Sequence, residues 1–332
     1  MTANIPVGNA TSMQFGTVAN VKKQVSRLIL GSPIFSPPDK NYAYSMLDEF
    51  VRLGGTTLET AHSYGDGDCE RMIGRWVSER GLRDQITIIT KGGHHFDLRQ
   101  RIIPECITAD MQESLARLQT DYIDIYMLHR DDPTRPVDEI VECLDAHKRA
   151  GRIRAYGGSN WTAARIQEAN DFARKRNLTP FVVGSPHFSL AVPHQEPWPG
   201  CIWLTDADRS WYEKNDVALI AWSSQARGFF ARQTADNEND TGVLKAWLND
   251  SNLERLKRAK AIAAERAISA NAVALAYVLA QKFNTFAAIG PVNFKEMHDS
   301  FSALGCKLTE DEMKWLNLER DQVPDAKAAH RS

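Results

Sequence analysis

The regular alternation of short apolar runs with longer amphipathic segments constrains the fold more than any other feature of this chain. The short runs are rich in β-branched and aromatic residues, whereas the segments between them carry apolar residues at helical spacing. Strand–helix units repeated in this way build a parallel sheet. Strands are expected at residues 56–60, 85–91, 122–129, 153–160, 180–186, 216–223 and 285–290, with helices among them at 107–119, 137–151 and 162–177.

The number of units predicts a closed (β/α)8 TIM barrel. An eighth, short strand is expected at 304–307, followed by a helix at 309–319. An open doubly wound sheet is less consistent with the sequence, because no G-x-G-x-x-G phosphate-binding motif follows any of these strands. The segment 25–35 is expected to form an N-terminal β-hairpin that plugs or covers the barrel bottom. Long βα loops, which carry function in barrels, are expected at 187–203 and 226–252.

Composition and charge fit one globular domain over residues 1–332, with 1–20 flexible and 320–332 forming a C-terminal tail. The net charge of -2 favours a small-molecule partner over nucleic acid or an anionic membrane. No apolar run reaches the roughly 18 residues that a membrane span requires. The 5 cysteines contain no C-x-x-C pair, which favours a reduced, cytoplasmic location. The oligomeric state stays open.

Ionisable side chains follow several strand ends. Glu59 and Tyr64 follow the strand at 56–60, Lys91 ends the next strand, and His129 ends the one after. Because parallel strands deliver their last residues to one rim, these groups should converge. Taken singly, each also has a structural interpretation: an ion pair for Glu59, a snorkelling Lys91, a satisfied core histidine at 129.

Together these groups suit proton transfer coupled to reduction of a carbonyl. A lysine ammonium bonded to a tyrosine hydroxyl lowers the pKa of the phenol, and a carboxylate keeps that ammonium charged and oriented. Tyr64 could then act as general acid while His129 orients the carbonyl oxygen. Such a reduction needs a hydride donor, hence a nicotinamide.

Four motifs, in order along nearly the whole chain, resemble those of the aldo-keto reductases: ETAHSYG (59–65), ITIITKGG (86–93), DYIDIYMLHRDDP (121–133) and YGGSN (156–160). The resemblance implies an NAD(P)H-dependent oxidoreductase that reduces an aldehyde or ketone. Tyr64 would be the general acid, Lys91 its partner, Glu59 the counterpart of the family's aspartate and His129 the substrate-orienting donor. NADP is the family's commoner cofactor, and NAD is possible.

The resemblance also implies a set of cofactor-binding residues. Ser159 and Asn160 would bind the nicotinamide carboxamide, Trp222 would stack on the ring, and the segment 288–304 would close over the adenosine half. The full set is Ser159, Asn160, Ser185, Trp222, Ser223, Ala226, Gly228, Gly290, Pro291, Asn293, Glu296, Asp299 and Ser300.

Three positions depart from the family pattern. Glu59 is longer than the usual aspartate by one methylene. Ser185 replaces a glutamine, which weakens one carboxamide contact or routes it through water. Val292 stands where many members carry an arginine for the 2′-phosphate of NADP, so discrimination against NAD should fall unless Lys295 or another cation substitutes.

The loops after the strands supply candidate substrate-binding residues: His95, Phe96, Arg130, His187, Phe188, Trp198 and Trp203. Aromatic rings, imidazoles and an arginine suit a polyhydroxylated carbonyl compound, although a small aldehyde or an aromatic ketone also fits. The tryptophans could instead only pack a proline-rich loop. The neighbouring pair His94 and His95 lacks further ligands at metal-binding spacing, so no metal is expected.

Two alternatives to the reductase hypothesis remain. The same site could run in the oxidative direction, as an NAD(P)-dependent sugar or alcohol dehydrogenase. The fold also serves, by resemblance, as a cofactor-binding, redox-sensing regulatory subunit with little turnover. His62 is expected to have a structural role only.

Overall fold

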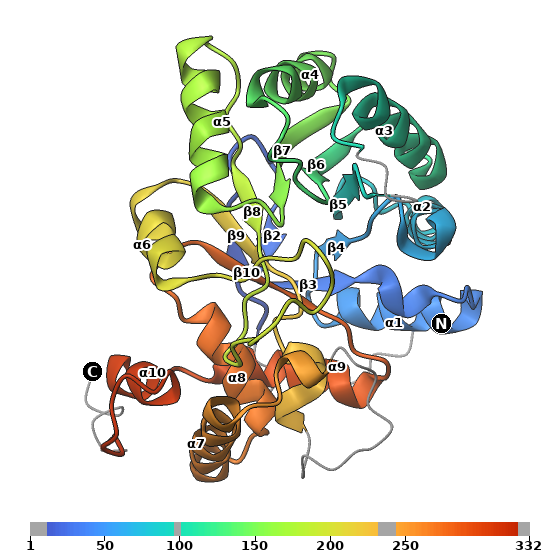
Figure 1. Ribbon diagram of the computed structural model, residues 1–332. Helices are drawn as coiled ribbons and strands as arrows, with labels where there is room; N and C mark the ends of the chain where they lie inside the picture. Colours follow the sequence, from blue (N-terminus) through green and yellow to red (C-terminus); the bar gives the residue numbers. More distant parts are fainter. Residues whose placement is uncertain (1–11, 96–100, 232–243, 325–332) are drawn as a thin grey trace.

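Eight parallel strands form a closed barrel in the computed structural model, which describes residues 12–95, 101–231 and 244–324 (Figure 1). Around the barrel the order is β10-β3-β4-β5-β6-β7-β8-β9. The strands are β3 (Leu28–Gly31), β4 (Thr57–Glu59), β5 (Thr87–Gly92), β6 (Ile123–Leu128), β7 (Ile153–Ser159), β8 (Val183–Ser185), β9 (Ala218–Ala221) and β10 (Thr285–Ile289). The expected (β/α)8 barrel is confirmed.

Helices cover the outside of the barrel (Figure 1). They are α1 (Lys40–Arg52), α2 (Asp68–Arg80), α3 (Pro104–Leu118), α4 (Val137–Arg149), α5 (Ala163–Lys175), α6 (Asp206–Lys214), α7 (Asp250–Arg266), α8 (Ala270–Leu279), α9 (Phe294–Ser302) and α10 (Glu310–Leu316). Helix α3 begins three residues before the expected start because Pro104, whose ring fixes φ and lacks an N–H, fits the first helical turn. Thr162 caps α5 by accepting a hydrogen bond from the Arg165 amide.

The expected eighth strand at 304–307 is wrong. Residues 303–305 form a short 3₁₀ helix instead. The position beside β10 is taken by β3, which pairs in parallel through Ala287 with Leu28 and through Ile289 with Leu30. Strand β3 lies within the segment 25–35 that the sequence assigns to a hairpin, and all four of its residues are buried.

The N-terminal β-hairpin is present but lies earlier, between β1 (Phe15–Gly16) and β2 (Val25–Ser26). Val18 and Val25 join the cluster inside the barrel, so the hairpin closes the barrel bottom. Asn284 donates a hydrogen bond to the Thr17 carbonyl (2.7 Å). Residues 15–17, within the segment 1–20 that the sequence predicts to be flexible, form part of this hairpin.

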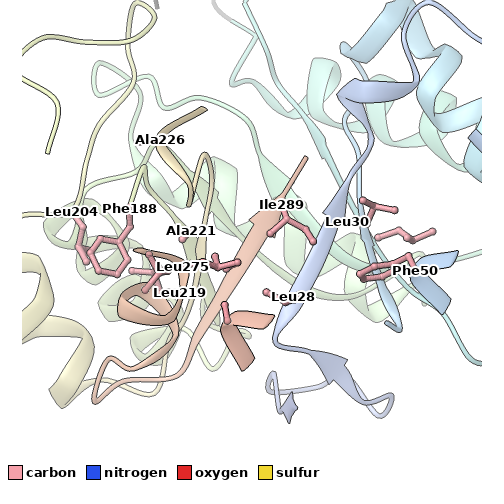
Figure 2. Packing of buried hydrophobic residues seen from close by; sticks show 14 of the residues in the cluster. Leu28, Leu30, Phe50, Phe188, Leu204, Leu219, Ala221, Ala226, Leu275 and Ile289 are labelled. Atoms are coloured by element: carbon pink, nitrogen blue, oxygen red, sulfur yellow. The ribbon is translucent and has the colours of Figure 1, made fainter. Parts of the chain in front are cut away.

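Side chains alternate between two apolar layers along each strand. Ile29, Ile89, Ile125 and Ile220 point into the barrel and form one cluster. Leu28, Leu30, Leu219 and Ile289 belong to the larger cluster between strands and helices (Figure 2). This alternation decides which residues at the strand ends face the barrel axis.

No single helix in the described ranges is long and apolar enough to cross a membrane. Helices α7 and α8 meet the length and composition criteria only as a pair, and they are bent by 100° at their junction.

Candidate active site

The candidate residues continue the inward-facing rows of the barrel strands. Lys91 follows Ile89 two positions later on β5, and His129 follows Met127 at the end of β6. Ser159 ends β7, Ser185 ends β8 and Trp222 follows Ala221, the last residue of β9. Because successive side chains alternate in a strand, residues in these rows point toward the barrel axis at its carboxyl-terminal rim.

Lys91 lies at the centre of a buried cluster. Its ammonium forms an ion pair with the Glu59 carboxylate and donates to the Thr60 carbonyl (2.9 Å) and to the Tyr64 hydroxyl (3.1 Å). The Tyr64 hydroxyl also donates to Glu59 Oε1 (3.3 Å). Lys91 is 2% exposed, so water cannot replace these contacts. The expected Glu59, Lys91 and Tyr64 group is therefore assembled.

Burial dominates the protonation of this cluster. It raises the pKa of Tyr64 well above its usual value, and the positive charge of Arg130 opposes this rise. Burial also lowers the pKa of Lys91, with Arg130 adding to the effect, whereas contact with the Glu59 carboxylate favours the ammonium. The net direction for Tyr64 is opposite to the lowering expected from Lys91. A raised pKa keeps the phenol protonated at neutral pH.

His129 lies beside Tyr64 with ring centroids 5.6 Å apart, and His94 lies on its other side at 4.7 Å. Burial, followed by the charges of Lys91 and Arg130, lowers the pKa of His129 well below its usual value. The imidazole is therefore neutral near pH 7. Its Nδ1 is buried and has no hydrogen-bond partner among the described residues.

Gly31 makes room for the longer side chain of Glu59. These residues pair across β3 and β4, and a Cβ built at residue 31 would lie 3.2 Å from Glu59 Oε2. Any larger residue at 31 would crowd the carboxylate. The added methylene of Glu59 is thus accommodated by the neighbouring strand, and the carboxylate still reaches Lys91.

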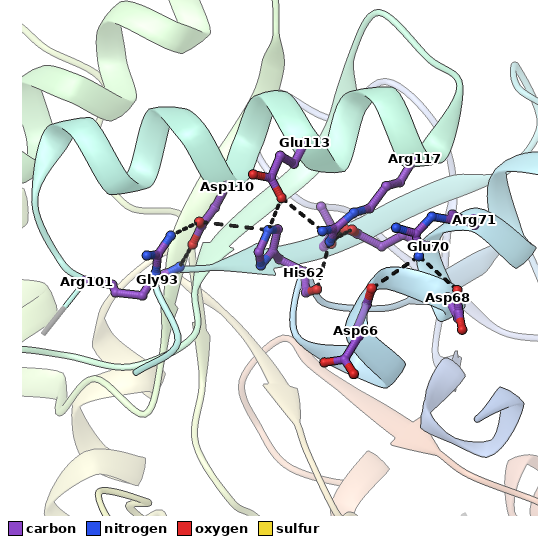
Figure 3. A network of polar contacts seen from close by, with 11 residues as sticks. His62, Asp66, Asp68, Glu70, Arg71, Gly93, Arg101, Asp110, Glu113 and Arg117 are labelled. Atoms are coloured by element: carbon purple, nitrogen blue, oxygen red, sulfur yellow. Dashed lines mark hydrogen bonds and ion pairs between the residues drawn. The ribbon is translucent and has the colours of Figure 1, made fainter. Parts of the chain in front are cut away.

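The turn after β4 sends its side chains in two directions. Gly65 and Gly67 have φ of 54° and 86°, and this left-handed backbone favours glycine. Tyr64 points to Lys91, whereas His62 contacts Glu113 of α3 (2.9 Å). Figure 3 shows His62 within a network that also includes Asp110 and Arg117. These contacts agree with the structural role expected for His62.

The expected carboxamide-binding residues lie together on neighbouring strands. The Ser159 hydroxyl donates to the Ser185 carbonyl (3.1 Å), and the Asn160 amide N–H donates to the same oxygen (3.0 Å). The Asn160 side chain donates to the His129 carbonyl (3.2 Å). Ser185 donates instead to the Ile220 carbonyl (2.7 Å), so its hydroxyl stabilises the neighbouring strand.

Trp222 begins a loop with unusual backbone geometry. Its Nε1 is buried and has no hydrogen-bond partner in the described parts of the chain. Ser223, Ala226 and Gly228 all have φ between 44° and 84°. Left-handed conformations are strained for serine and alanine, and such strain concentrates at ligand-binding segments. Gln225 of this loop donates to the Ser300 hydroxyl of α9 (3.0 Å), linking two predicted cofactor-binding segments.

The candidates near α9 have defined structural contacts. Asn293 caps the helix by accepting from the Glu296 amide (2.9 Å), and Glu296 accepts from the Val292 amide (3.0 Å). Asp299 accepts from Asn271 of α8 (3.1 Å). Gly290 and Pro291 form the link from β10 to this helix.

The predicted substrate residues separate into two groups. Arg130 and His95 lie beside the cluster, since the charge of Arg130 acts on both His95 and Tyr64. Trp198 lies against Trp222 at 5.9 Å, and Trp203 forms a β-bridge with His187. Phe96 lies outside the described residues.

The positions of Phe188 and His187 do not support direct substrate contact. Phe188 is 3% exposed and packs against Tyr277 of α8 and beneath Arg209 of α6. His187 is buried between Trp222 (5.0 Å) and Trp247 (5.2 Å), and burial lowers its pKa to about 3. It therefore supports Trp222 from inside the loop.

Sequence reasoning missed the Thr60 carbonyl, Gln225 and Trp247. The first is a backbone acceptor, which no side-chain pattern reveals. Gln225 stands between Ser223 and Ala226, two of the predicted cofactor-binding residues, so its position was a usable signal. Within the described ranges no group of three or more histidine, cysteine or acidic residues is arranged to hold a metal.

Comparisons with known proteins agree with this geometry. Residues 15–317 match the model of the Aldo/keto reductase family. The chain is 29% identical to norsolorinic acid reductase of Aspergillus flavus, covering 84% of this chain and 71% of that protein. It is 28% identical to aryl-alcohol dehydrogenase [NADP(+)] of Phanerodontia chrysosporium, covering 86% and 77%.

The fold is also found in solved structures. A thermostable aldo-keto reductase, crystallised with the inhibitor epalrestat, has a TM-score of 0.72 at 22% identity, covering 92% of this chain and 99% of that one. The family match spans most of the chain and coincides with the barrel and its rim cluster. The chain belongs to the aldo/keto reductase family and is an NAD(P)-dependent oxidoreductase.

Proposed function

We propose that the protein reduces an aldehyde or ketone to an alcohol with Tyr64 as general acid. The observation that carries the proposal is the 3.1 Å contact between Lys91 Nζ and the Tyr64 hydroxyl, inside a buried group that Glu59 completes. A tyrosine kept protonated by burial holds the proton that a developing alkoxide needs. A bound nicotinamide supplies the hydride.

The other residues of the cluster have complementary roles. The ammonium of Lys91 stabilises the phenolate that forms as Tyr64 gives up its proton, and Glu59 fixes the position of that ammonium. The neutral His129 orients the carbonyl oxygen by donating a hydrogen bond from one ring nitrogen. This role agrees with its place 5.6 Å from the Tyr64 ring.

The residues around the rim suit a dinucleotide. Ser159 and Asn160 lie beside His129, and the ring of Trp222 adjoins that of Trp198. The loop 223–228 has left-handed backbone at Ser223, Ala226 and Gly228, and such backbone is concentrated at ligand-binding segments. Gln225 ties this loop to α9. Ser159, Asn160 and Trp222 would hold the nicotinamide, the loop 223–228 would hold the pyrophosphate, and α9 would hold the adenosine half.

NADP is the proposed cofactor, with NAD as the alternative. The name of the fungal aryl-alcohol dehydrogenase specifies NADP(+). Val292, however, is 55% exposed and offers no charge to a 2′-phosphate, and the nearby cation is the exposed Lys295. Val292→Arg should strengthen NADPH binding relative to NADH by about tenfold, because a charge-assisted hydrogen bond is added.

Aromatic aldehydes and ketones are the proposed substrates. Trp198 and Trp222 present rings at the rim, and relatives are named for norsolorinic acid and for aryl alcohols. The second candidate function is oxidation of the corresponding alcohol, which the name of the aryl-alcohol dehydrogenase favours. The same cluster would serve both directions, with Tyr64 accepting the proton in oxidation.

Fluorescence titration with NADPH and NADH tests the proposal first. Binding should quench tryptophan emission, and Trp222→Phe should reduce that quenching. A panel of benzaldehydes and aryl ketones should then be reduced, as followed by cofactor absorbance. Binding without turnover of any carbonyl or alcohol would favour the regulatory alternative, and absence of binding by either cofactor would refute the proposed chemistry.

A further inference from the structure

Arg130 is a cation at the active-site rim, and no carboxylate in the described part of the chain pairs with it. It is half-buried directly after His129, and its Nη1 donates to the His129 carbonyl (3.0 Å). No aspartate or glutamate of the described residues lies within 4.0 Å of its guanidinium. A guanidinium keeps its positive charge near neutral pH. When it is partly buried without a nearby carboxylate, that charge is not compensated and favours binding of an anion.

The carboxylates next to Arg130 in the sequence are already occupied. Asp131 pairs with Arg165 of α5 (3.3 Å). Asp132 accepts from the amide and the hydroxyl of Thr134 (3.1 and 2.6 Å). Both acids therefore have partners other than Arg130.

Other contacts hold Arg130 in place. Its carbonyl accepts from Trp161 Nε1 (3.0 Å), which fixes the backbone after β6. The loop 187–203 passes close to its stem, since a Cβ built at Gly200 would lie 3.8 Å from Arg130 Cδ. Asn160 shares the His129 carbonyl with it (3.2 Å). The guanidinium is thus positioned between the expected carboxamide site and the loop.

Arg130 acts on several ionisable groups of the pocket. Lys91 and Glu59 compensate each other, and burial followed by Arg130 lowers the pKa of Lys91 and of His95. His129 is likewise neutral near pH 7. Arg130 is thus a positive charge that acts on Tyr64, Lys91 and His129, while the Asp132 carboxylate opposes its effect at His95.

We propose that Arg130 binds a carboxylate of the substrate, so that the preferred substrates are carbonyl compounds that bear a carboxylate. This inference rests on the proposed function. One guanidinium matches one monoanion in charge, and its planar fork matches a carboxylate in geometry. Hydride passes from cofactor to carbonyl carbon and a proton from Tyr64 to oxygen, while the carboxylate is unchanged.

Matched esters test the inference. The ortho, meta and para isomers of formylbenzoate are compared with their methyl esters as substrates, using kcat/KM at low ionic strength. The carboxylate should be preferred for at least one isomer, and that isomer reports the spacing between Arg130 and Tyr64. In Arg130→Met the ratio of carboxylate to ester kcat/KM should fall by about 10- to 100-fold, the range for a hydrogen bond to a charged group.

Two further variants separate charge from structure. Arg130→Lys keeps the charge and should recover part of the carboxylate preference. Arg154→Met removes an exposed arginine at the opposite end of the barrel and should leave the ratio unchanged. Equal kcat/KM for carboxylate and ester in the wild type, or an unchanged ratio in Arg130→Met, would overturn the inference while leaving the reductase proposal intact.

A binding measurement tests the carboxylate site even if the protein reduces none of these compounds. Calorimetric titration of the cofactor-loaded protein with each formylbenzoate should give weaker binding in Arg130→Met than in the wild type and Arg154→Met. If no carbonyl is reduced but this difference appears, the proposed function fails and the anion site stands. Binding that Arg130→Met does not weaken would refute the site in either case.

Discussion

Each end of the barrel carries a lysine, a carboxylate and a tyrosine, but in different arrangements. At the amino-terminal end of the strands these are Lys23, Asp124 and Tyr122, and at the carboxyl-terminal end Lys91, Glu59 and Tyr64. Residue type alone therefore does not distinguish a structural cluster from a candidate catalytic one. The contacts of each cluster do.

The amino-terminal cluster uses its polar atoms to hold backbone. Asp124 accepts from Lys23 (2.9 Å), from Arg83 (2.8 Å) and from the Ile88 amide of β5 (3.0 Å). Lys23 donates in turn to the carbonyls of Arg83 and Ile86 (2.7 and 2.8 Å). Tyr122 contributes its ring face, which lies 3.8 Å from the Arg83 guanidinium.

The carboxyl-terminal cluster positions the hydroxyl of Tyr64 rather than backbone groups. The Lys91 ammonium reaches the Tyr64 oxygen, and buried nitrogens nearby, His129 Nδ1 and Trp222 Nε1, have no hydrogen-bond partner in the described structure. Buried polar atoms without a partner are costly for folding, and a bound ligand is one way to satisfy them. The difference supports the proposal that the carboxyl-terminal end binds and reacts, whereas the contacts of the amino-terminal cluster stabilise the barrel.

Removal of the tyrosine hydroxyl at each end gives the largest expected contrast. Tyr64→Phe should lower kcat by about 10²- to 10⁴-fold, because the general acid is lost, while cofactor binding is retained. Tyr122→Phe keeps the ring face that contacts the cations and should leave kcat unchanged. Steady-state reduction of benzaldehyde and cofactor titration measure both effects. A Tyr64→Phe enzyme with wild-type kcat would assign the proton transfer elsewhere.

Neutralising the carboxylate at each end should separate stability from activity. Asp124→Asn leaves Lys23 and Arg83 without their counter-ion and should lower the free energy of unfolding by about 3 kcal/mol, with little change in kcat of the folded enzyme. Glu59→Gln should lower kcat by about 10- to 100-fold, because Lys91 loses the charge that favours its ammonium. Urea unfolding and steady-state kinetics are the measurements.

The opposite pattern for these two variants would break the comparison. A Glu59→Gln protein that lost only stability would make the carboxyl-terminal pair structural. An Asp124→Asn protein with normal stability would show that the amino-terminal pair contributes little net free energy, as partly exposed pairs often do.

The sequence could predict the barrel and the rim cluster because both follow from periodicity. Polar residues at the ends of apolar strands identify Glu59, Lys91 and His129, since parallel strands end at one rim. It could not place the closing strand, because β3 is only four residues long and follows directly on the hairpin. The segment 304–307 was assigned instead because a helical pattern at 309–319 follows it.

The sequence also could not predict which way the side chains of the loop 187–203 point. Phe188 and Trp198 are both aromatic residues of the segment 187–203, yet Phe188 packs against α8 and Trp198 against Trp222. The choice depends on tertiary contacts and has no local period. The net pKa direction of Tyr64 was missed for a related reason, because burial depends on the whole rim.

Acid should destabilise the carboxyl-terminal end of the barrel through His187, which is buried there. His187 has a pKa of about 3 when folded, against about 6.5 when unfolded. Below about pH 6.5 the unfolded chain binds a proton that the folded protein does not, so stability falls as pH falls toward about 3, by at most about 1.4 kcal/mol per pH unit for this residue. His187→Gln should flatten that slope in urea unfolding, whereas His194→Gln, at an exposed position, should not. An unchanged slope in His187→Gln would show that the acid sensitivity comes from other groups and that His187 is not held neutral by burial.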